Sequence, residues 1–257
     1  MKAIRHSGSK KNLVCKELRD AILRGELLPG TRLVIKDLAA RLDVSPIPVR
    51  EALQQLEADG YVVIEPYIGG TVAPIESESI NEVFHLLEAM ETFSSVAACR
   101  QLSKEDFAEL QSVLVQMDSL VNDPEAWSRA NKHFHQLICD GSGTRLIGTL
   151  MTKVLDHLER FQCFFLKDVF SELLPKAQKE HWLILEALRK RDTARITMLT
   201  QQHNRTCLTA FTRRLRKLEQ PQAQNSSRSN GSGKGLEHKD TNGAIIRMNR
   251  RARRTQR

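Results

Sequence analysis

Apolar residues in the first part of the chain recur with the spacing of helices that are packed on one side. Val14, Leu18 and Ile22 predict a helix over about residues 11–24, which Gly25 ends. A second, shorter helix is predicted after a turn rich in glycine and proline. Its apolar stripe consists of Ile35, Leu38, Ala39 and Leu42. Two short helices packed through these stripes are therefore expected.

A third helix is predicted to begin sharply within the stretch VSPIPVREALQQLEADGYVV. Proline is tolerated in the first helical turn, so Ser45 is expected as the N-cap, Pro46 as the first helical residue and Pro48 within that turn. The residues predicted to face inward are Val49, Ala52, Leu53 and Leu56. Those predicted to face outward are Ile47, Arg50, Glu51 and Gln54. The helix therefore starts rigidly and turns its polar side away from the core.

A β-hairpin is predicted next. The segments YVVIE and TVAPI are typical of two strands, joined by a loop that contains Gly69 and Gly70. Three helices followed by a hairpin describe a winged helix-turn-helix, whose third helix enters the major groove of DNA. Arg50 is the residue expected to reach a phosphate or a guanine edge. The alternative is that Arg50 pairs only with Glu51 or solvent.

From about residue 77 to 218 the chain is predicted to be helical throughout. Ser103, with Asp106 three residues later, predicts one helix start, and Asp123 before Pro124 predicts another. The first of these helices is predicted to bury Phe107, Leu110, Leu114, Met117 and Val121. Further helices are predicted over about residues 146–165, 175–191 and 192–218. The expected fold is mostly α, an N-terminal winged helix-turn-helix followed by an antiparallel helical bundle.

Length and charge refine this picture. The 257 residues suffice for two domains, expected at 10–74 and 77–218, between a flexible N-terminus (1–9) and a disordered basic tail (219–257). Of the formal net charge of +8, +7 falls after residue 220, so both domains are close to neutral. The basic pI alone is therefore no argument for nucleic-acid binding. A tail that binds DNA without sequence preference is an alternative function.

Cysteines and hydropathy indicate the compartment. The five cysteines are scattered and contain no C-x-x-C pair, which is typical of thiols kept reduced. No apolar run approaches the roughly 20 residues that span a bilayer, and the first twelve residues lack the pattern of a secretory signal. We therefore expect a cytoplasmic protein with no membrane partner.

The stretch LRDAILRGELLPGTRLVIKDLAARLDVSPIPVREALQQLEADGYV resembles the N-terminal domain of GntR-family bacterial transcription regulators. The G-x-L-x-P-G turn, LA, VS and PVREAL-x-x-L-E-x-x-G occur together with the family's spacing. The helical remainder resembles the FadR-type effector domain, called FCD. The resemblance covers about residues 10–218. It implies a homodimer on a palindromic DNA operator, with repression the favoured mode, and a small-molecule metabolite that changes its DNA affinity.

The resemblance also implies which residues contact DNA. The expected set is Lys36, Ser45, Pro46, Ile47, Arg50, Gln54 and Gly69. Family members often carry arginine at the positions of Pro46 and Ile68, neither of which is basic here, whereas Lys36 and Arg50 stay basic. DNA binding with an altered sequence preference is therefore expected.

FadR-type bundles often hold a divalent metal with one acidic residue and three histidines. The pattern falls here on Asn131, His135, His181 and His203. Three imidazoles suit zinc or nickel, and the neutral amide of Asn131 is a weaker ligand than a carboxylate. The alternative is that these are ordinary core histidines. No organic cofactor is expected.

The resemblance also places an effector pocket near these histidines. The residues expected to form it are Leu87, Phe134, Phe161 and Phe165. Family members often carry arginine at the position of Leu87 to bind an effector carboxylate, so a more apolar pocket is expected here. The alternative is that the phenylalanines are only core residues.

A metal-dependent hydrolase built on the histidines is a competing function. Such an enzyme needs a general base beside the metal, and the sequence has neither an H-E-x-x-H helix nor a carboxylate paired with the histidines. We therefore do not expect an enzyme.

Overall fold

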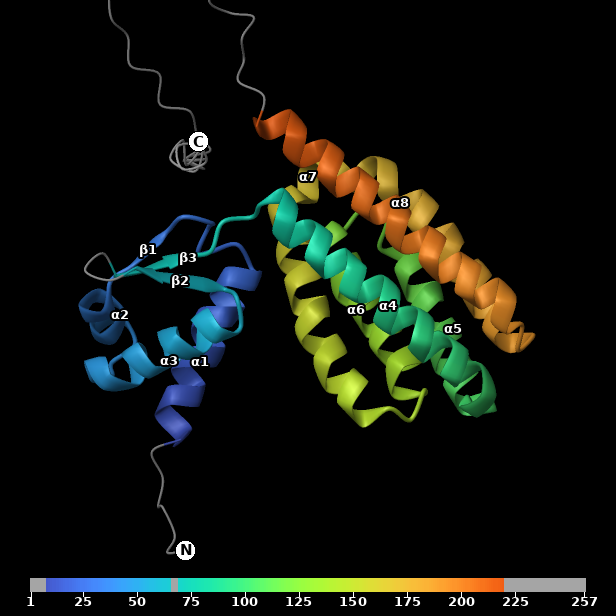
Figure 1. The fold of residues 1–257 in the computed structure, drawn as a ribbon, viewed down its shortest axis with the longest axis horizontal. Helices are drawn as coiled ribbons and strands as arrows, with labels where there is room; N and C mark the ends of the chain where they lie inside the picture. The colour runs from blue at the N-terminus through green and yellow to red at the C-terminus, as the bar shows by residue number, and fades with distance from the viewer. Residues whose placement is uncertain (1–7, 66–68, 220–257) are drawn as a thin grey trace, which may run out of the picture. The chain divides into compact units, whose positions relative to one another are not determined.

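A computed structural model of the chain describes residues 8–65 and 69–219 (Figure 1). Two compact units are divided between Pro74 and Ile75. The first combines helices with a small sheet, and the described part of the second consists of helices. The protein is thus mostly α-helical, which confirms the predicted fold class.

The first unit consists of three helices and a small antiparallel sheet. Its elements are α1 (Gly8–Leu23), β1 (Arg32–Leu33), α2 (Ile35–Arg41), α3 (Pro46–Ala58), β2 (Val62–Glu65) and β3 (Gly69–Val72). The strand order is β1-β3-β2, and Arg32 in β1 pairs with Thr71 in β3. The predicted two-stranded hairpin lacks β1, because a strand of two residues is too short to produce a hydropathy pattern. The prediction that Gly69 and Gly70 lie in its loop is wrong, since both residues pair with β2 as the first half of β3, which ends at Val72. This is the architecture of a winged helix-turn-helix.

One apolar cluster holds this unit together. Leu53 and Leu56 of α3 are buried in it with Leu18 of α1. Gly60, with φ of +79°, turns the chain out of α3, and the N–H of Tyr61 then donates to the carbonyl of Leu56 at 2.8 Å. Because this packing fixes the inward side of α3, its opposite side faces solvent.

The second unit is a bundle of long helices. They are α4 (Ser77–Gln101), α5 (Lys104–Ser119), α6 (Pro124–Asp140), α7 (Arg145–Arg189) and α8 (Thr193–Glu219). Two predicted helix starts are confirmed. The hydroxyl of Ser103 accepts from the N–H of Asp106 at 3.1 Å, while the Asp106 carboxylate accepts from the N–H of Ser103 at 2.8 Å. The Asp123 carboxylate caps α6 by accepting from the N–H of Ala126 at 3.0 Å.

The helices predicted over 146–165 and 175–191 are one continuous helix, α7, so the predicted break between them is wrong. Pro175 lies inside this helix, where it lacks an N–H group and crowds the preceding turn, which kinks helices. Figure 1 shows that the yellow and gold parts of α7 run in different directions. We call residues 145–165 the first arm of α7 and residues 173–189 the second arm.

The two arms belong to different apolar clusters. The first arm packs with α4 and the C-terminal half of α8, through residues such as Phe161. The second arm packs with α5 and α6, through residues such as Leu185. Val121, predicted to be buried on the same helix as Leu114, is exposed because α5 ends at Ser119. The kink thus lets one helix serve two parts of the core.

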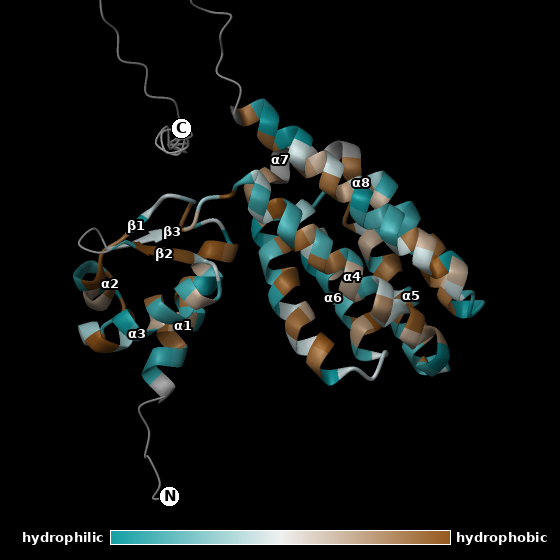
Figure 2. Ribbon diagram, viewed as in Figure 1, coloured by the Kyte–Doolittle hydropathy of each residue, from teal (hydrophilic) through white to brown (hydrophobic). Residues whose placement is uncertain are grey.

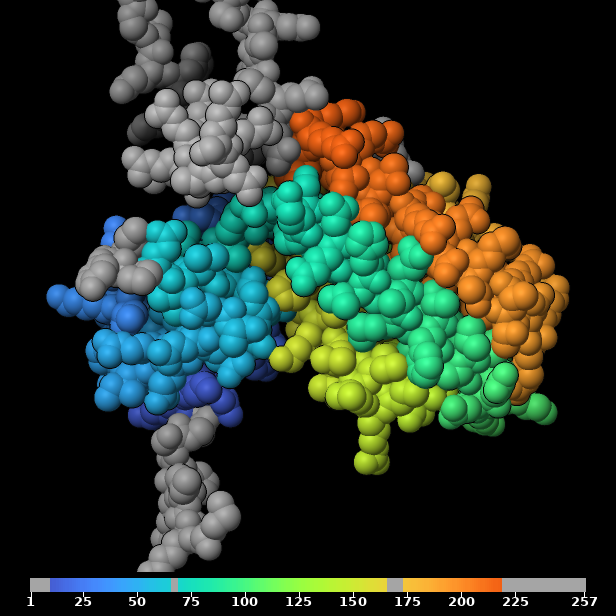
Figure 3. Space-filling model, in the orientation of Figure 1, coloured from blue at the N-terminus to red at the C-terminus, as the bar shows by residue number. Residues whose placement is uncertain are grey.

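The bundle surface is polar over much of α8, as the teal colour on its visible side shows (Figure 2). α4 and α8 lie side by side on the face seen in Figure 3. Within the described ranges, no helix has both the length and the apolar character that a membrane crossing requires. All five cysteines carry free thiols, and Cys99 and Cys139 are buried.

Replacing Leu114, a fully buried residue of α5, by alanine should lower the free energy of unfolding of the bundle by about 2–5 kcal/mol, because it leaves a cavity. Both tryptophans, Trp127 and Trp182, contact the same cluster, so their fluorescence during urea unfolding of the full chain reports this change. Val115→Ala, next in sequence but 55% exposed, is the control and should shift stability by less than about 0.5 kcal/mol. Equal effects of the two substitutions would contradict the packing.

Candidate functional site

The exposed side of α3 carries the residues expected to meet DNA. Ile47, Arg50 and Gln54 are all exposed, and Ile47 keeps 67% of its surface accessible. Within the described chain, Arg50 has no hydrogen bond or ion pair with Glu51. The structure therefore gives no support to the alternative in which its neighbour neutralises Arg50.

The start of α3 offers fewer backbone donors than an ordinary helix start. Ser45 occupies the N-cap position, as predicted, but its hydroxyl makes no capping hydrogen bond. Four N–H groups at a helix start lack intrahelical partners, and here Pro46 and Pro48 have no N–H at all. Only Ser45 and Ile47 retain such donors, so side chains must supply most contacts to a phosphate at this end.

The remaining predicted DNA contacts lie on α2 and β3. Lys36 is exposed near the start of α2. Gly69 begins β3 with φ of +103°, a conformation that favours glycine. Ile68 and the basic tail after residue 219 lie outside the described residues. Lys36, Gly69 and the exposed residues of α3 all belong to the first unit.

Three histidines from three helices meet inside the bundle. His135 on α6, His181 on the second arm of α7 and His203 on α8 are buried, and one ring nitrogen of each lies within 4.8 Å of the others. The Nε2 atoms of His181 and His203 are 3.3 Å apart. Two nitrogens bound at about 2.0–2.1 Å to a tetrahedral zinc ion are about 3.3–3.4 Å apart. The spacing of this pair therefore fits a shared cation.

Carboxylates orient two of the three rings. Nδ1 of His135 lies 2.9 Å from a Glu91 oxygen, and Nδ1 of His203 lies 2.8 Å from a Glu180 oxygen. Asn204 donates to the second oxygen of Glu91 at 2.7 Å. A proton held on Nδ1 by a carboxylate leaves the lone pair on Nε2, as in histidines that bind metals. Both rings can thus direct Nε2 toward the centre.

The rings of His181 and His203 differ in how readily they hold a proton. Burial, and then the neighbouring His203 and His135, hold the pKa of His181 well below its usual value, so this ring is neutral. Burial acts in the same direction on His203, but Cys207 and Glu180 outweigh it and raise the pKa of His203 well above the usual value. The Cys207 sulfur lies 4.0 Å from Nε2 of His203. A proton or a metal cation can supply the charge that this arrangement favours.

Asn131 completes the predicted set. It is 4% exposed, and its Oδ1 atom is buried without a hydrogen-bond partner among the described residues, as is Nδ1 of His181. An unpaired buried oxygen costs about 1–3 kcal/mol, which a cation beside it would offset. Three imidazole nitrogens and one amide oxygen fit a zinc or nickel ion. The four residues that the sequence singles out therefore fit a metal.

Sequence reasoning missed Glu91, Glu180 and Cys207. The prediction that no carboxylate is paired with the histidines is therefore wrong. Glu91 follows Leu87 by four residues on the buried face of α4, so its position in an apolar stripe is a usable signal. Cys207 follows His203 by one helical turn on α8. Glu180 is adjacent to His181, but adjacency in a helix does not predict that both side chains turn inward.

The cavity beside the histidines is small. It measures about 30 Å³, and Leu87 lines it together with Asn131. Phe134, Phe161 and Phe165 are buried in the apolar clusters and are not among the described residues that line this cavity. Such a volume holds about two water molecules. Of the four residues predicted for an effector pocket, only Leu87 lies at this cavity.

Taken together, a winged helix-turn-helix with an exposed recognition helix and a helical bundle with a polar centre define a DNA-binding regulator that carries a ligand-responsive domain. Comparison with known families agrees. Residues 10–72 match the bacterial regulatory proteins of the gntR family, and residues 82–206 match the FCD domain.

Individual relatives give the same result. An uncharacterised HTH-type transcriptional regulator from an unstable DNA locus of Streptomyces ambofaciens is 32% identical over 72% of this chain and 78% of its own. The HTH-type transcriptional repressor GlaR of Escherichia coli K12 is 28% identical over 72% of this chain and 88% of its own. The crystal structure of a GntR regulator from Rhodococcus sp. RHA1 is 26% identical with a TM-score of 0.67, covering 79% of this chain and 98% of its own.

The chain belongs to the GntR family, and its FCD domain places it with the FadR-like members. It is a DNA-binding transcriptional regulator with an effector-binding domain. Its relatives are regulators, not enzymes, which favours regulation over the hydrolase alternative.

Proposed function

We propose that the protein is a homodimeric repressor, in which α3 of each copy reads one half of a palindromic operator. The observation that carries this proposal is that Ile47, Arg50 and Gln54 are exposed on α3, in a helix whose first turn is fixed by two prolines. Repression is inferred from relatives such as GlaR, which is named a repressor.

The chemistry of these side chains suits the major groove. Arg50 can donate two parallel hydrogen bonds to a guanine edge, and Gln54 can do so to adenine. The exposed methyl groups of Ile47 suit the methyl group of thymine. Lys36 and the hydroxyl of Ser45 can contact phosphates, which positions the helix without reading sequence.

Arg50→Ala should weaken binding to an operator fragment about 5- to 150-fold, since one good base contact contributes about 1–3 kcal/mol. The fragment would be selected from random-sequence DNA by the full-length wild-type protein, and affinities would be measured by fluorescence anisotropy. Arg145→Ala removes the same charge from an exposed position of the bundle and should leave affinity unchanged. If both variants bind equally well, Arg50 is not a recognition residue.

The surface of α4 supports a homodimer. Leu86 and Phe93 are seven residues apart on one side of the helix and are 44% and 55% exposed. Exposed Glu82 and Arg100 lie near the two ends of the same stripe. If two copies of α4 pack antiparallel about a twofold axis, Glu82 of each copy approaches Arg100 of the other while the apolar residues between them are buried. This self-complementarity indicates a second copy of the chain as the partner.

Phe93→Asp should convert the protein from dimer to monomer at micromolar concentration, because it buries a charge in the stripe. Sedimentation equilibrium of the full-length chain measures the mass. Val115→Asp introduces the same charge at a position of α5 that is equally exposed, and it should remain dimeric. A Phe93→Asp protein with the mass of a dimer would rule out this face.

We also propose that Asn131, His135, His181 and His203 hold one zinc or nickel ion. Support comes from the clustered ring nitrogens, the unpaired Asn131 oxygen and the Glu91 carboxylate behind His135. Such an ion would act as a Lewis acid able to bind an anionic group of an effector. The chain's own contribution is to keep two of the rings oriented through the carboxylates of Glu91 and Glu180.

Asn131→Asp should bind Zn²⁺ more tightly than the wild type, because it adds a negative charge at the ion. Glu180→Gln should weaken binding about 10- to 100-fold by loosening His203, and His181→Ala should weaken it further. Competition with a chromophoric chelator measures the affinities. His133→Ala, an exposed histidine on the same helix as Asn131, is the control and should match the wild type. If Asn131→Asp, Glu180→Gln and His181→Ala all bind Zn²⁺ with the affinity of the wild type, the site is refuted.

A further inference from the structure

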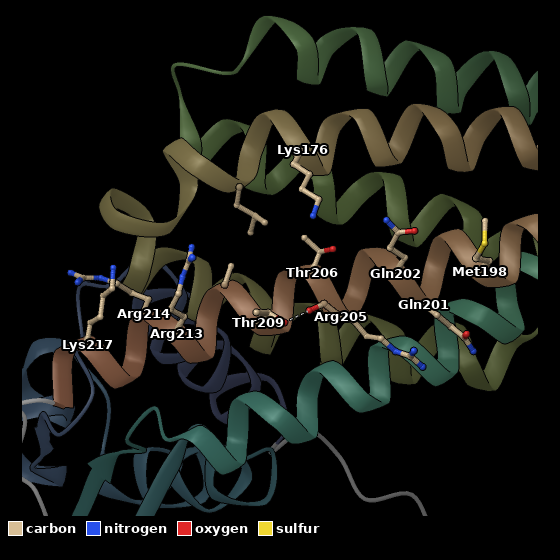
Figure 4. Close-up of a pocket in the computed structure, with 12 residues that line it drawn as sticks. Lys176, Met198, Gln201, Gln202, Arg205, Thr206, Thr209, Arg213, Arg214 and Lys217 are labelled. Atoms are coloured by element: carbon tan, nitrogen blue, oxygen red, sulfur yellow. Dashed lines mark hydrogen bonds between the residues drawn. The ribbon is translucent and has the colours of Figure 1, made fainter.

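An open groove runs between the second arm of α7 and α8 (Figure 4). Its volume is about 650 Å³, which falls in the range of small-molecule sites. Five of the residues that line it are cationic, namely Lys176, Arg205, Arg213, Arg214 and Lys217. None of the twelve described residues along the groove is acidic. The groove therefore combines a concave shape with a single sign of charge.

The side chains converge from both helices. Figure 4 shows Lys176 extending from α7 and Arg213 from α8 into the space between the helices. Gln202 and Thr206 point into the same space between them. A ligand here would meet two cationic groups on opposite walls and neutral hydrogen-bonding groups along the floor.

The five cations differ in their partners, and Arg213 and Arg214 have interactions of their own within the molecule. Arg205 turns toward α4 and donates to both carboxylate oxygens of Glu88, at 3.1 and 2.8 Å. Lys176 and Lys217, in contrast, have no ion pair or hydrogen bond within the described chain. Like charges gathered in a concave surface raise the local electrostatic potential, and a multiply charged anion lowers it. Lys176 and Lys217 therefore carry positive charge in the groove that no described side chain neutralises.

We propose that this groove binds a small phosphorylated anion that carries several negative charges. The cavity beside the histidines, at about 30 Å³, is about twenty times smaller than the groove, so the groove has far more room for an organic ligand than that cavity has. Arginine and lysine together suit phosphate, since guanidinium forms paired hydrogen bonds with its oxygens and ammonium adds a point charge. The alternative is that these residues form an ordinary basic helix surface that contacts only solvent.

The groove is distinct from the histidine centre, although the two are neighbours: Leu173 lines both the groove and the small cavity beside the histidines. The hydroxyl of Thr206 lies 3.5 Å from one oxygen of Glu180, and the other oxygen of Glu180 contacts His203. A metal at that centre is not required, because none of the four residues proposed to hold it lines the groove. The proposed groove site likewise does not depend on DNA binding.

The test is calorimetric titration of full-length protein with inorganic tripolyphosphate, in buffer of moderate ionic strength. We expect one saturable site per chain in the wild type, and an affinity about five- to tenfold lower in Lys176→Ala, which removes one of the facing charges. Arg213→Ala is a second, independent variant and should show a similar loss. The basic residues after 219 contribute the same background to every protein, so differences between variants are assigned to the groove.

Lys179→Ala is the matched control. Lys179 is exposed on the same arm of α7, three residues after Lys176, but does not line the groove, and its removal should leave the affinity unchanged. Absence of a saturable site, or equal losses in Lys176→Ala and Lys179→Ala, would overturn the proposal. Titration with citrate tests the ligand class: affinity equal to that for tripolyphosphate would overturn the assignment to phosphate.

Discussion

The bundle depends on a buried polar network to which four of its helices contribute. Glu91 comes from α4, His135 from α6, Glu180 and His181 from the second arm of α7, and His203 from α8. A polar group that loses its partner in such a place costs about 1–3 kcal/mol, and a charged one costs more. The network therefore fixes the rotation of each helix about its axis and its position along that axis. Apolar packing alone specifies both less strictly.

This constraint explains the shape of α7. Its first arm packs in the cluster that includes Phe161, and its second arm must bring His181 and Glu180 to the histidines of α6 and α8. A straight helix of this length could not serve both tasks, and Pro175 supplies the kink. The same bend leaves the outer side of the second arm facing α8, where the cationic groove lies.

Much of the fold could be predicted from residue patterns. The helices of the first unit, the proline-fixed start of α3 and the capping box at Ser103 follow from local rules that tertiary contacts did not override. The short strand β1 could not be predicted, because two residues are too few to show an alternation of apolar and polar positions. The continuity of α7 could not be predicted either, because a proline usually marks a helix boundary.

The candidate functional residues could also be predicted only in part. The exposed side of α3 follows from which residues pack inward, whereas the histidines were identified by family resemblance, since a histidine in an apolar stripe looks like any core residue. Burial of Glu91 was not predicted, because acidic residues in helices are usually exposed. Two prolines at the start of α3 mark its boundary clearly, yet they also remove half of the backbone donors there.

The ligand-responsive domain and the DNA-binding domain can influence each other only through differences in ligand affinity between conformations of the whole molecule. The polar centre is where a bound cation would find ligands, because the Nε2 atoms of His181 and His203 lie 3.3 Å apart and the Asn131 oxygen has no hydrogen-bond partner among the described residues. We therefore propose that a cation completes this centre.

Anomalous X-ray diffraction from crystals of the full-length protein, purified without chelator, tests this claim most directly. We expect one anomalous peak per chain above the zinc or nickel absorption edge, within bonding distance of Asn131, His135, His181 and His203. An ordered centre without such a peak, in which the rings bond only to one another and to water, would contradict it.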